Sequence, residues 1–267
     1  MTVIPEAPHG ARAGAAGGSR PTAAGRMLSV LDAFGPRHRN LSLSEIARRA
    51  GLTLPTAHRL VGELVGWGAL ERDDNGRYSV GLRLLELSAL APRGLELRDA
   101  AFPHLEDLHR ATRGNIHLGV RDGREVVYIE AIRARVPNPL NSRVGYRWPM
   151  HVTGTGLVLL AYEDTALQEE VLASPLERFS PMTVTDPAEL RRTLARIRQT
   201  GVAVARGQIT LPDLVVAVPV RDPAGRVAAA ISVVVAAERA RPRELAGVLT
   251  QASRAISRTL GPRTPAH

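Results

Sequence analysis

Polar and basic side chains with the chemistry to bind duplex DNA are concentrated in one short segment near the N-terminus. Thr53 and Pro55 begin a predicted helix, and Thr56, His58 and Arg59 follow within its first turns. A helical wheel places Pro55 and Arg59 opposite the apolar positions, with Thr56 and His58 on the flanks. An arginine can donate two hydrogen bonds to the edge of a guanine. The pattern favours DNA recognition, although an ordinary helical hairpin inside a core would read similarly.

A second segment has the chemistry to bind an anion. Gly154-Thr155-Gly156 opens an apolar helix predicted over 157–162. The free N–H groups and the dipole of a helix N-terminus attract negative charge. Glycines at such a place also allow a helix to pack closely on a sheet, and the residues alone leave both interpretations open.

Catalytic and metal-binding patterns are weak in this sequence. His104 and His109 flank Glu106 on one predicted helix, but their five-residue spacing takes them off a common face, whereas zinc sites use i, i+4 pairs. His117 and Asp122 have no serine or cysteine partner at a motif spacing. The chain contains no cysteine, which excludes disulfides, thiolate nucleophiles and cysteine-based zinc sites. We expect no enzymatic activity, no cofactor and no metal site.

The elements that must position the first segment are two short helices joined by a glycine. Ser42 and Glu45 have the spacing of a capping box, and Gly51 suits the left-handed end of that helix. Thr53 is the expected N-cap of the second helix. Residues 22–36 read as a bracing helix. The buried stripe of the second helix recurs at helical spacing and consists of Ala57, Leu60, Val61 and Leu64. Together these elements form a predicted helix-turn-helix.

A hairpin is predicted directly after the helix-turn-helix. Asp74-Asn75-Gly76 is a strong turn signal because Asn-Gly supplies positive φ angles. Arg72 and Arg77 flank the turn, where they could contact phosphates or simply be solvated. The strand residues expected to alternate toward the core are Leu70, Tyr78 and Val80.

The remainder of the chain predicts an α+β domain with an antiparallel sheet. Helices are expected over 82–91, which Pro92 and Gly94 end, and over 96–112, which Pro103 should bend. The first twenty residues are rich in Gly, Ala and Pro and read as a disordered tail. Further strands are expected over 115–121, 126–132, 202–205, 214–220 and 227–235, with an irregular segment or edge strand over 137–143 and helices over 157–162, 164–172, 187–200 and 242–260.

The composition is basic in an unusual way. The net charge is +9, and all 35 basic residues other than histidine are arginine, because the chain contains no lysine. A polyanionic partner and the drift of a GC-rich genome both explain this balance. No run of about 18 apolar residues and no signal-peptide pattern occurs, so we expect a cytoplasmic protein without a membrane partner.

Taken together, the chain resembles the IclR-type bacterial transcriptional regulators over about residues 22–260. The resemblance implies a winged helix-turn-helix domain over 21–81, a linker helix over 82–97 and a GAF-like effector-binding and oligomerisation domain over 98–262. The motifs that carry it are LSLSEIARRAGLTLPTAHRLVGEL, GALERDDNGRYSVGLRLLEL, RDAAFPHLEDLHRAT, RWPMHVTGTGLVLLA and VVAVPVRDPAGRVAAAISVVV.

The resemblance also implies a function and partners. Such a protein is a homodimer or tetramer that binds a double-stranded DNA operator and represses or activates a catabolic or secondary-metabolic operon in response to a small molecule. The resemblance places Thr56, His58 and Arg59 against DNA, and we include Thr53, Pro55, Arg72 and Arg77 in the contact set. The alternative is a DNA-binding scaffold whose second domain only oligomerises.

The expected effector pocket departs from the family pattern. The resemblance places the ligand against Gly154, Thr155 and Gly156, near Ser232. Ala205 and Val215 occupy positions that are polar in carboxylate-sensing members, which predicts an organic acid that is aromatic or branched, or a lactone. Further candidate contacts are His117, Tyr128 and His151.

Overall fold

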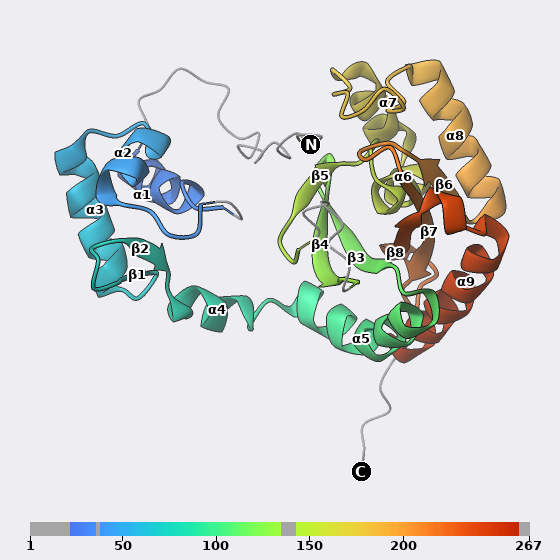
Figure 1. Ribbon diagram of the computed structural model, residues 1–267, viewed down its shortest axis with the longest axis horizontal. Coiled ribbons are helices and arrows are strands. Elements are labelled where there is room, and N and C mark those ends of the chain that lie inside the picture. The colour runs from blue at the N-terminus through green and yellow to red at the C-terminus, as the bar shows by residue number, and fades with distance from the viewer. Residues whose placement is uncertain (1–21, 36–37, 135–142, 262–267) are drawn as a thin grey trace, which may run out of the picture. The chain divides into compact units, whose positions relative to one another are not determined.

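The computed structural model describes residues 22–35, 38–134 and 143–261, and it divides the chain into two compact units at the junction of Leu95 and Glu96 (Figure 1). The junction lies within the predicted linker 82–97. The linker itself differs from the expectation. The helix expected to continue to residue 91 ends at Ser88, and the next helix begins at Pro92, where proline is tolerated in a first turn.

The N-terminal unit is a winged helix-turn-helix. Its apolar core is formed by residues from the three helices and the hairpin, and Val30, Ile46, Leu60 and Leu70 are fully buried. The tail predicted over 1–20 lies outside the described residues. The elements are α1 (Ala23–Asp32), α2 (Leu43–Ala50), α3 (Leu54–Gly66), β1 (Leu70–Arg72), β2 (Tyr78–Val80) and α4 (Leu82–Ser88).

Local signals fix the start and end of α2. The backbone N–H of Ser42 donates to Glu45 Oε2 at 2.7 Å, and the Ser42 hydroxyl accepts from the Glu45 N–H, so the capping box is confirmed. Gly51 has a φ of +65° and ends the helix as expected. Thr53 stands at the N-cap of α3, but its side chain makes no capping bond. Its hydroxyl donates instead to the Thr56 hydroxyl at 2.9 Å.

The hairpin forms with a different turn from the one expected. Gly76 alone in the turn has a positive φ, at +74°, and Asn75 does not share it. The Asp73 carboxylate accepts hydrogen bonds from the backbone N–H groups of Asn75 and Arg77, and these bonds stabilise the turn. Val80 was expected in the core and is half exposed, since β2 ends there.

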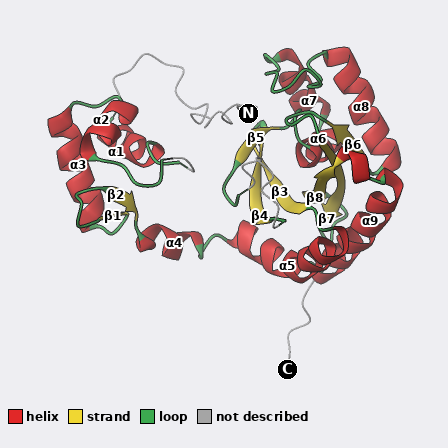
Figure 2. Ribbon diagram, in the orientation of Figure 1, coloured by secondary structure: helices red, strands yellow, loops and turns green. Residues whose placement is uncertain are grey.

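The C-terminal unit contains a six-stranded antiparallel sheet in the order β5-β4-β3-β8-β7-β6 (Figure 2). The strands are β3 (Asn115–Asp122), β4 (Glu125–Ile132), β5 (Arg147–Pro149), β6 (Ala203–Arg206), β7 (Asp213–Arg221) and β8 (Val227–Ala236). The helices are α5 (Pro92–Thr112), α6 (Gly154–Tyr162), α7 (Thr165–Ala173), α8 (Pro187–Thr200) and α9 (Pro242–Thr259), with a 3-10 turn over Ala237–Arg239.

Alternating strand residues divide the interior of this unit into two cores. Helix α6, with α7 and α8, packs on one face through residues such as Leu160 and Leu194. Helices α5 and α9 cover the opposite face through residues such as Leu105 and Leu249. The α+β class with an antiparallel sheet is therefore confirmed. Most of the segment expected to be irregular over 137–143 lies outside the described residues. Within the described ranges, no helix is long and apolar enough to cross a membrane.

Candidate functional site: a DNA-binding helix and a buried pocket

Helix α3 presents the predicted DNA-binding residues on its solvent side. Its apolar stripe is buried as expected, which turns Pro55, His58 and Arg59 outward and leaves Thr56 partly covered. Arg59 forms an i, i+4 ion pair with Glu63, and both side chains are about half exposed. An exposed pair of this kind contributes under about 1 kcal/mol, so a nearby phosphate or base can replace Glu63 as the partner.

The two wing arginines have different surroundings. The Arg72 guanidinium lies over the Tyr78 ring, 5.7 Å from its centroid, and the side chain is exposed. Arg77 donates to Glu45 Oε2 at 3.0 Å and to the Asn40 carbonyl at 2.9 Å. Arg77 therefore ties the wing to the capping box of α2. Its intramolecular partners compete with the predicted phosphate contact.

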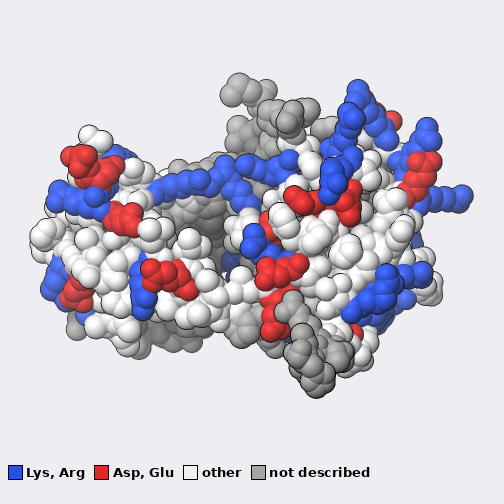
Figure 3. Space-filling view, turned by 90° about the horizontal axis from the view of Figure 1, so that it is seen from below, with Lys and Arg blue, Asp and Glu red and all other residues white. Residues whose placement is uncertain are grey.

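Arginines elsewhere are widely distributed. Figure 3 shows arginine and acidic side chains interspersed over the visible face. Many of them form ion pairs, including Arg98 with the buried Glu130 and Arg147 with Glu125 and Asp122.

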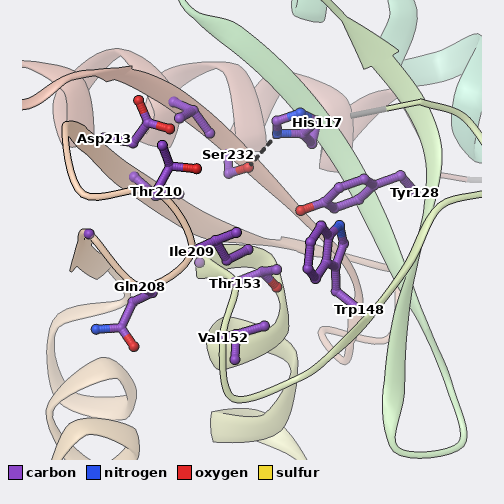
Figure 4. A pocket seen from close by; sticks show the side chains of 14 residues that line it. His117, Tyr128, Trp148, Val152, Thr153, Gln208, Ile209, Thr210, Asp213 and Ser232 are labelled. Carbon is purple, nitrogen blue, oxygen red and sulfur yellow. Dashed lines mark hydrogen bonds between the residues drawn. The ribbon is translucent and has the colours of Figure 1, made fainter. Parts of the chain in front are cut away.

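A pocket lies in the C-terminal unit, on the side of the sheet that α6 covers (Figure 4). It contains about 450 Å³ of space free of atoms, part of which is open to solvent. Lining residues come from β3, β4, β5, β7 and β8, the start of α6 and the loop between β6 and β7. They are His117, Tyr128, Trp148, Val152, Thr153, Gly154, Gly207, Gln208, Ile209, Thr210, Asp213, Val215, Ser232 and Val234.

The loop that closes one side of the pocket is held by side-chain hydrogen bonds. Gly207 turns the chain after β6 with a φ of +62°. The Gln208 amide donates to the Met182 carbonyl at 2.8 Å and accepts from the Val184 N–H at 3.0 Å. The Thr183 hydroxyl donates to the Gln208 carbonyl at 2.6 Å. These bonds fix residues 207–210 over the sheet.

Five of the nine residues predicted for the effector line this pocket. They are His117, Tyr128, Gly154, Val215 and Ser232. The other four do not line it. Thr155 and Gly156 are buried in packing around α6, Ala205 lies on the outer strand β6, and His151 bonds the Glu177 carbonyl through Nε2 at 2.9 Å.

Sequence reasoning missed nine lining residues, among them Trp148, Thr210 and Asp213. A signal existed for Val234, which follows Ser232 by two positions in one strand and so shares its face. The loop residues carried no such signal, because their place depends on contacts with the distant segment 180–184.

His117 is, with Ser232, one of the two most buried polar residues of the pocket lining. It is 1% exposed, and its Nδ1 lies 3.3 Å from the Ser232 hydroxyl. Its ring stacks on Tyr128 at 4.6 Å between centroids and an interplanar angle of 15°. Burial raises the pKa of Tyr128 to about 12, although hydrogen bonds from Thr155 and Thr153 oppose that rise. Tyr128 is therefore a neutral phenol near pH 7.

Two buried polar atoms of the pocket have no hydrogen-bond partner in the described structure. They are His117 Nε2 and Thr210 Oγ1. A buried polar group without a partner costs about 1–3 kcal/mol. Both atoms belong to residues that line the same pocket, so a ligand there could provide the missing partners.

The pH dependence of stability should reveal the buried histidine. Burial lowers the pKa of His117 to about 4, whereas an unfolded histidine titrates near pH 6.5. Below pH 6.5 the unfolded chain takes up a proton that the native state does not, so the free energy of unfolding falls as the pH drops from 6.5 to 4, by about 3 kcal/mol at the lower limit. Urea unfolding of His117→Gln should show a shallower decline over this range. If the free energy of unfolding falls with pH equally in both proteins, His117 does not have the lowered pKa.

The candidate enzyme residues do not assemble into a site. His109 Nδ1 lies 2.8 Å from the Gly114 carbonyl, just beyond the end of α5, which is a structural role. Among the described residues, no group of three or more His, Asp or Glu side chains has the arrangement of a metal site.

A winged helix-turn-helix joined in one chain to a pocket-bearing α+β unit defines a DNA-binding regulator with an effector domain. Residues 23–74 match the IclR helix-turn-helix domain, and residues 90–258 match the bacterial transcriptional regulator IclR C-terminal domain. The chain belongs to the IclR family of bacterial transcriptional regulators, which are not enzymes.

Relatives of known name and structure support this membership over most of the chain. The HTH-type transcriptional regulator XynR of Escherichia coli is 35% identical over 245 residues, 88% of this chain and 96% of XynR. An IclR homolog from Microbacterium hydrocarbonoxydans, crystallised with 4-hydroxybenzoate, is 36% identical with a TM-score of 0.85, covering 90% of this chain and 99% of the homolog. The IclR protein of Thermotoga maritima is 29% identical with a TM-score of 0.71, covering 89% and 96% of the two chains.

Proposed function

We propose that the protein is a cytoplasmic repressor of a catabolic or secondary-metabolic operon, and that a small aromatic acid bound in the pocket changes its affinity for the operator. The observation that carries this proposal is that two buried polar atoms without a partner in the described structure, His117 Nε2 and Thr210 Oγ1, belong to residues that line one pocket. Each of these atoms lowers the stability of the fold as long as it has no hydrogen-bond partner. A domain that only oligomerises would gain nothing that offsets this loss. The observation therefore favours sensing over the scaffold alternative.

The shape and lining of the pocket support an aromatic effector. Trp148 and Tyr128 provide flat apolar surfaces, and Val152, Ile209 and Val215 add aliphatic ones. Ala205 and Val215 are the two apolar residues at positions that are polar in carboxylate-sensing members. Ala205 does not line the pocket, so only Val215 can affect the choice of ligand. The 36% identical homolog was crystallised with 4-hydroxybenzoate, a compound of this class. At the start of α6, the Thr153 hydroxyl accepts from the Gly156 N–H, and the N–H of Gly154, which lines the pocket, lacks an intrahelical acceptor and suits a carboxylate.

We place the operator contacts on α3 and the wing, and the subunit contact on α4. Thr56, His58 and Arg59 are the proposed base-reading set, and Thr53 and Pro55 are further proposed DNA contacts. Helix α4 and the residues just after it expose leucines: Leu82 and Leu85 on the helix are 66% and 65% accessible, and Leu90, two residues beyond its end, is 76% accessible. A second copy of the chain that covers these leucines would remove them from water. A homodimer would bind two half-sites about one helical turn apart.

The experiment that tests the function is footprinting of the purified full chain on its own upstream DNA, with and without 4-hydroxybenzoate. We expect a protected palindrome whose protection changes when the compound is added. Protection that ignores 4-hydroxybenzoate and a wider set of aromatic acids and lactones would favour the scaffold alternative.

Salt dependence of operator binding should separate the two wing arginines. Arg72→Ala should reduce the slope of log K against log salt by about 1, because each phosphate contact releases counterions. Arg77→Ala should lower the melting temperature, since it removes the bonds to Glu45 and Asn40, and should leave the slope nearly unchanged. If both variants reduce the slope of log K against log salt by the same amount, Arg77 contacts a phosphate as well.

A further inference from the structure

The orientation of the effector in the pocket follows from the surroundings of His117. Nδ1 faces the Ser232 hydroxyl, and Tyr128 fixes the plane of the imidazole by stacking. Nε2 has no partner in the described structure and less than 1 Å² of accessible surface. In Figure 4 the His117 ring lies apart from Thr153 at the start of α6. His117 therefore holds one buried hydrogen-bonding atom without a partner beside the pocket that its side chain lines.

Tyr128 relates this atom to the start of α6. Its ring stacks on His117, and the Thr153 and Thr155 side chains lie close enough to its hydroxyl to lower its pKa. A single phenol ring thus spans from the imidazole to the N-terminus of α6. We therefore consider a ligand with one aromatic ring and a polar group at each end.

The two ends suit different polar groups. The first turn of α6 offers N–H donors and a positive dipole end, which favour a carboxylate. The imidazole is neutral near pH 7, because burial lowers its pKa, and it can donate or accept at Nε2 depending on its tautomer. A carboxylate against a neutral buried imidazole would have to recruit a proton, whereas a hydroxyl would not.

We propose that His117 is the specificity-determining residue of the pocket and that its Nε2 hydrogen-bonds a hydroxyl on the effector ring, with the carboxylate at the start of α6. This inference rests on the proposed function, and it narrows the effector class to hydroxylated aromatic acids. An acid without the hydroxyl leaves Nε2 unpartnered in a buried site and binds more weakly.

The first test is titration calorimetry of the full chain with 4-hydroxybenzoate and with benzoate. We expect the wild type to prefer 4-hydroxybenzoate by about 10- to 100-fold. His117→Phe keeps a stacking ring without the nitrogen, so it should bind both compounds equally and retain the benzoate affinity of the wild type. His117→Gln places an amide near Nε2 and should recover part of the preference, which a purely structural role would not produce.

The second test is proton linkage at pH 7, measured in two buffers of different ionisation enthalpy. A hydroxyl at His117 predicts no net proton uptake on binding of 4-hydroxybenzoate. Tyr128 and Asp213 are the other titratable residues of the lining, and they remain in His117→Phe. Uptake of close to one proton that disappears in His117→Phe would place the carboxylate at His117 and overturn the inference.

The outcomes separate the two proposals. If wild-type protein binds both compounds equally while either one changes operator affinity, His117 does not read a hydroxyl, and the proposed function stands. If neither compound binds, the aromatic-acid effector is wrong, and the inference about His117 is overturned with it.

Discussion

Replacing Arg59 with alanine is expected to weaken operator binding by about 10- to 100-fold without a measurable change in melting temperature. The loss corresponds to the ~1–3 kcal/mol that one bidentate arginine–guanine contact contributes to discrimination. Arg59 lies on the exposed side of α3, and its replacement removes the exposed ion pair with Glu63. Gel-shift titration on the footprinted operator measures the effect, with unrelated DNA as the comparison.

Glu63→Gln provides the matched control for Arg59→Ala. It breaks the same ion pair while keeping the guanidinium, and it removes a negative charge from the DNA-facing side. We therefore expect Glu63→Gln to bind DNA at least as tightly as the wild type. If Arg59→Ala weakens operator and unrelated DNA by the same factor, Arg59 contacts phosphate and does not read sequence.

Replacing Gly156 with alanine is expected to destabilise the effector domain by about 3 kcal/mol. A Cβ at this position would lie 2.4 Å from the Met150 carbonyl oxygen and 2.7 Å from the Thr153 hydroxyl. The first neighbour is backbone and cannot move aside without shifting the start of α6. Thermal unfolding should show a melting temperature lower by about 6–12 °C for a domain of this size.

Gly247→Ala is the control for Gly156→Ala. Gly247 also lies within a helix, α9, but a Cβ there meets nothing within 4 Å. Alanine is the better helix former by about 1 kcal/mol, so this variant should be slightly more stable than the wild type. Similar melting temperatures for Gly156→Ala and the wild type would show that α6 is packed less closely than its contacts indicate.

The sequence predicts the DNA-binding unit well because its signals are local. The capping box at Ser42, the left-handed Gly51 and the buried stripe of α3 each depend on residues within about one or two turns of a helix. The predictions failed where another side chain provides a competing partner. The Thr53 hydroxyl bonds the Thr56 hydroxyl, three residues further on, instead of a backbone N–H. Arg77 bonds Glu45, which is distant in the sequence.

The pocket could be predicted only in part because it is assembled from distant segments. The family resemblance pointed to Gly154 and Ser232, and both line it. Ala205 pairs directly with Val215 in the sheet, yet only Val215 reaches the pocket, because β6 is one strand further from His117. Thr210 and Asp213 lie near the end of the loop between β6 and β7, whose position is set by hydrogen bonds to segment 180–184. No pattern in the sequence predicts those bonds.

The most direct measurement is the reciprocal coupling between the operator and the effector. Operator affinity is measured with and without saturating 4-hydroxybenzoate, and effector affinity is measured for the free and the operator-bound protein. A ligand-responsive regulator requires both affinities to change by one common factor, which we expect to lie between about 5- and 150-fold. A compound that binds the pocket and leaves operator affinity unchanged would contradict the proposed function.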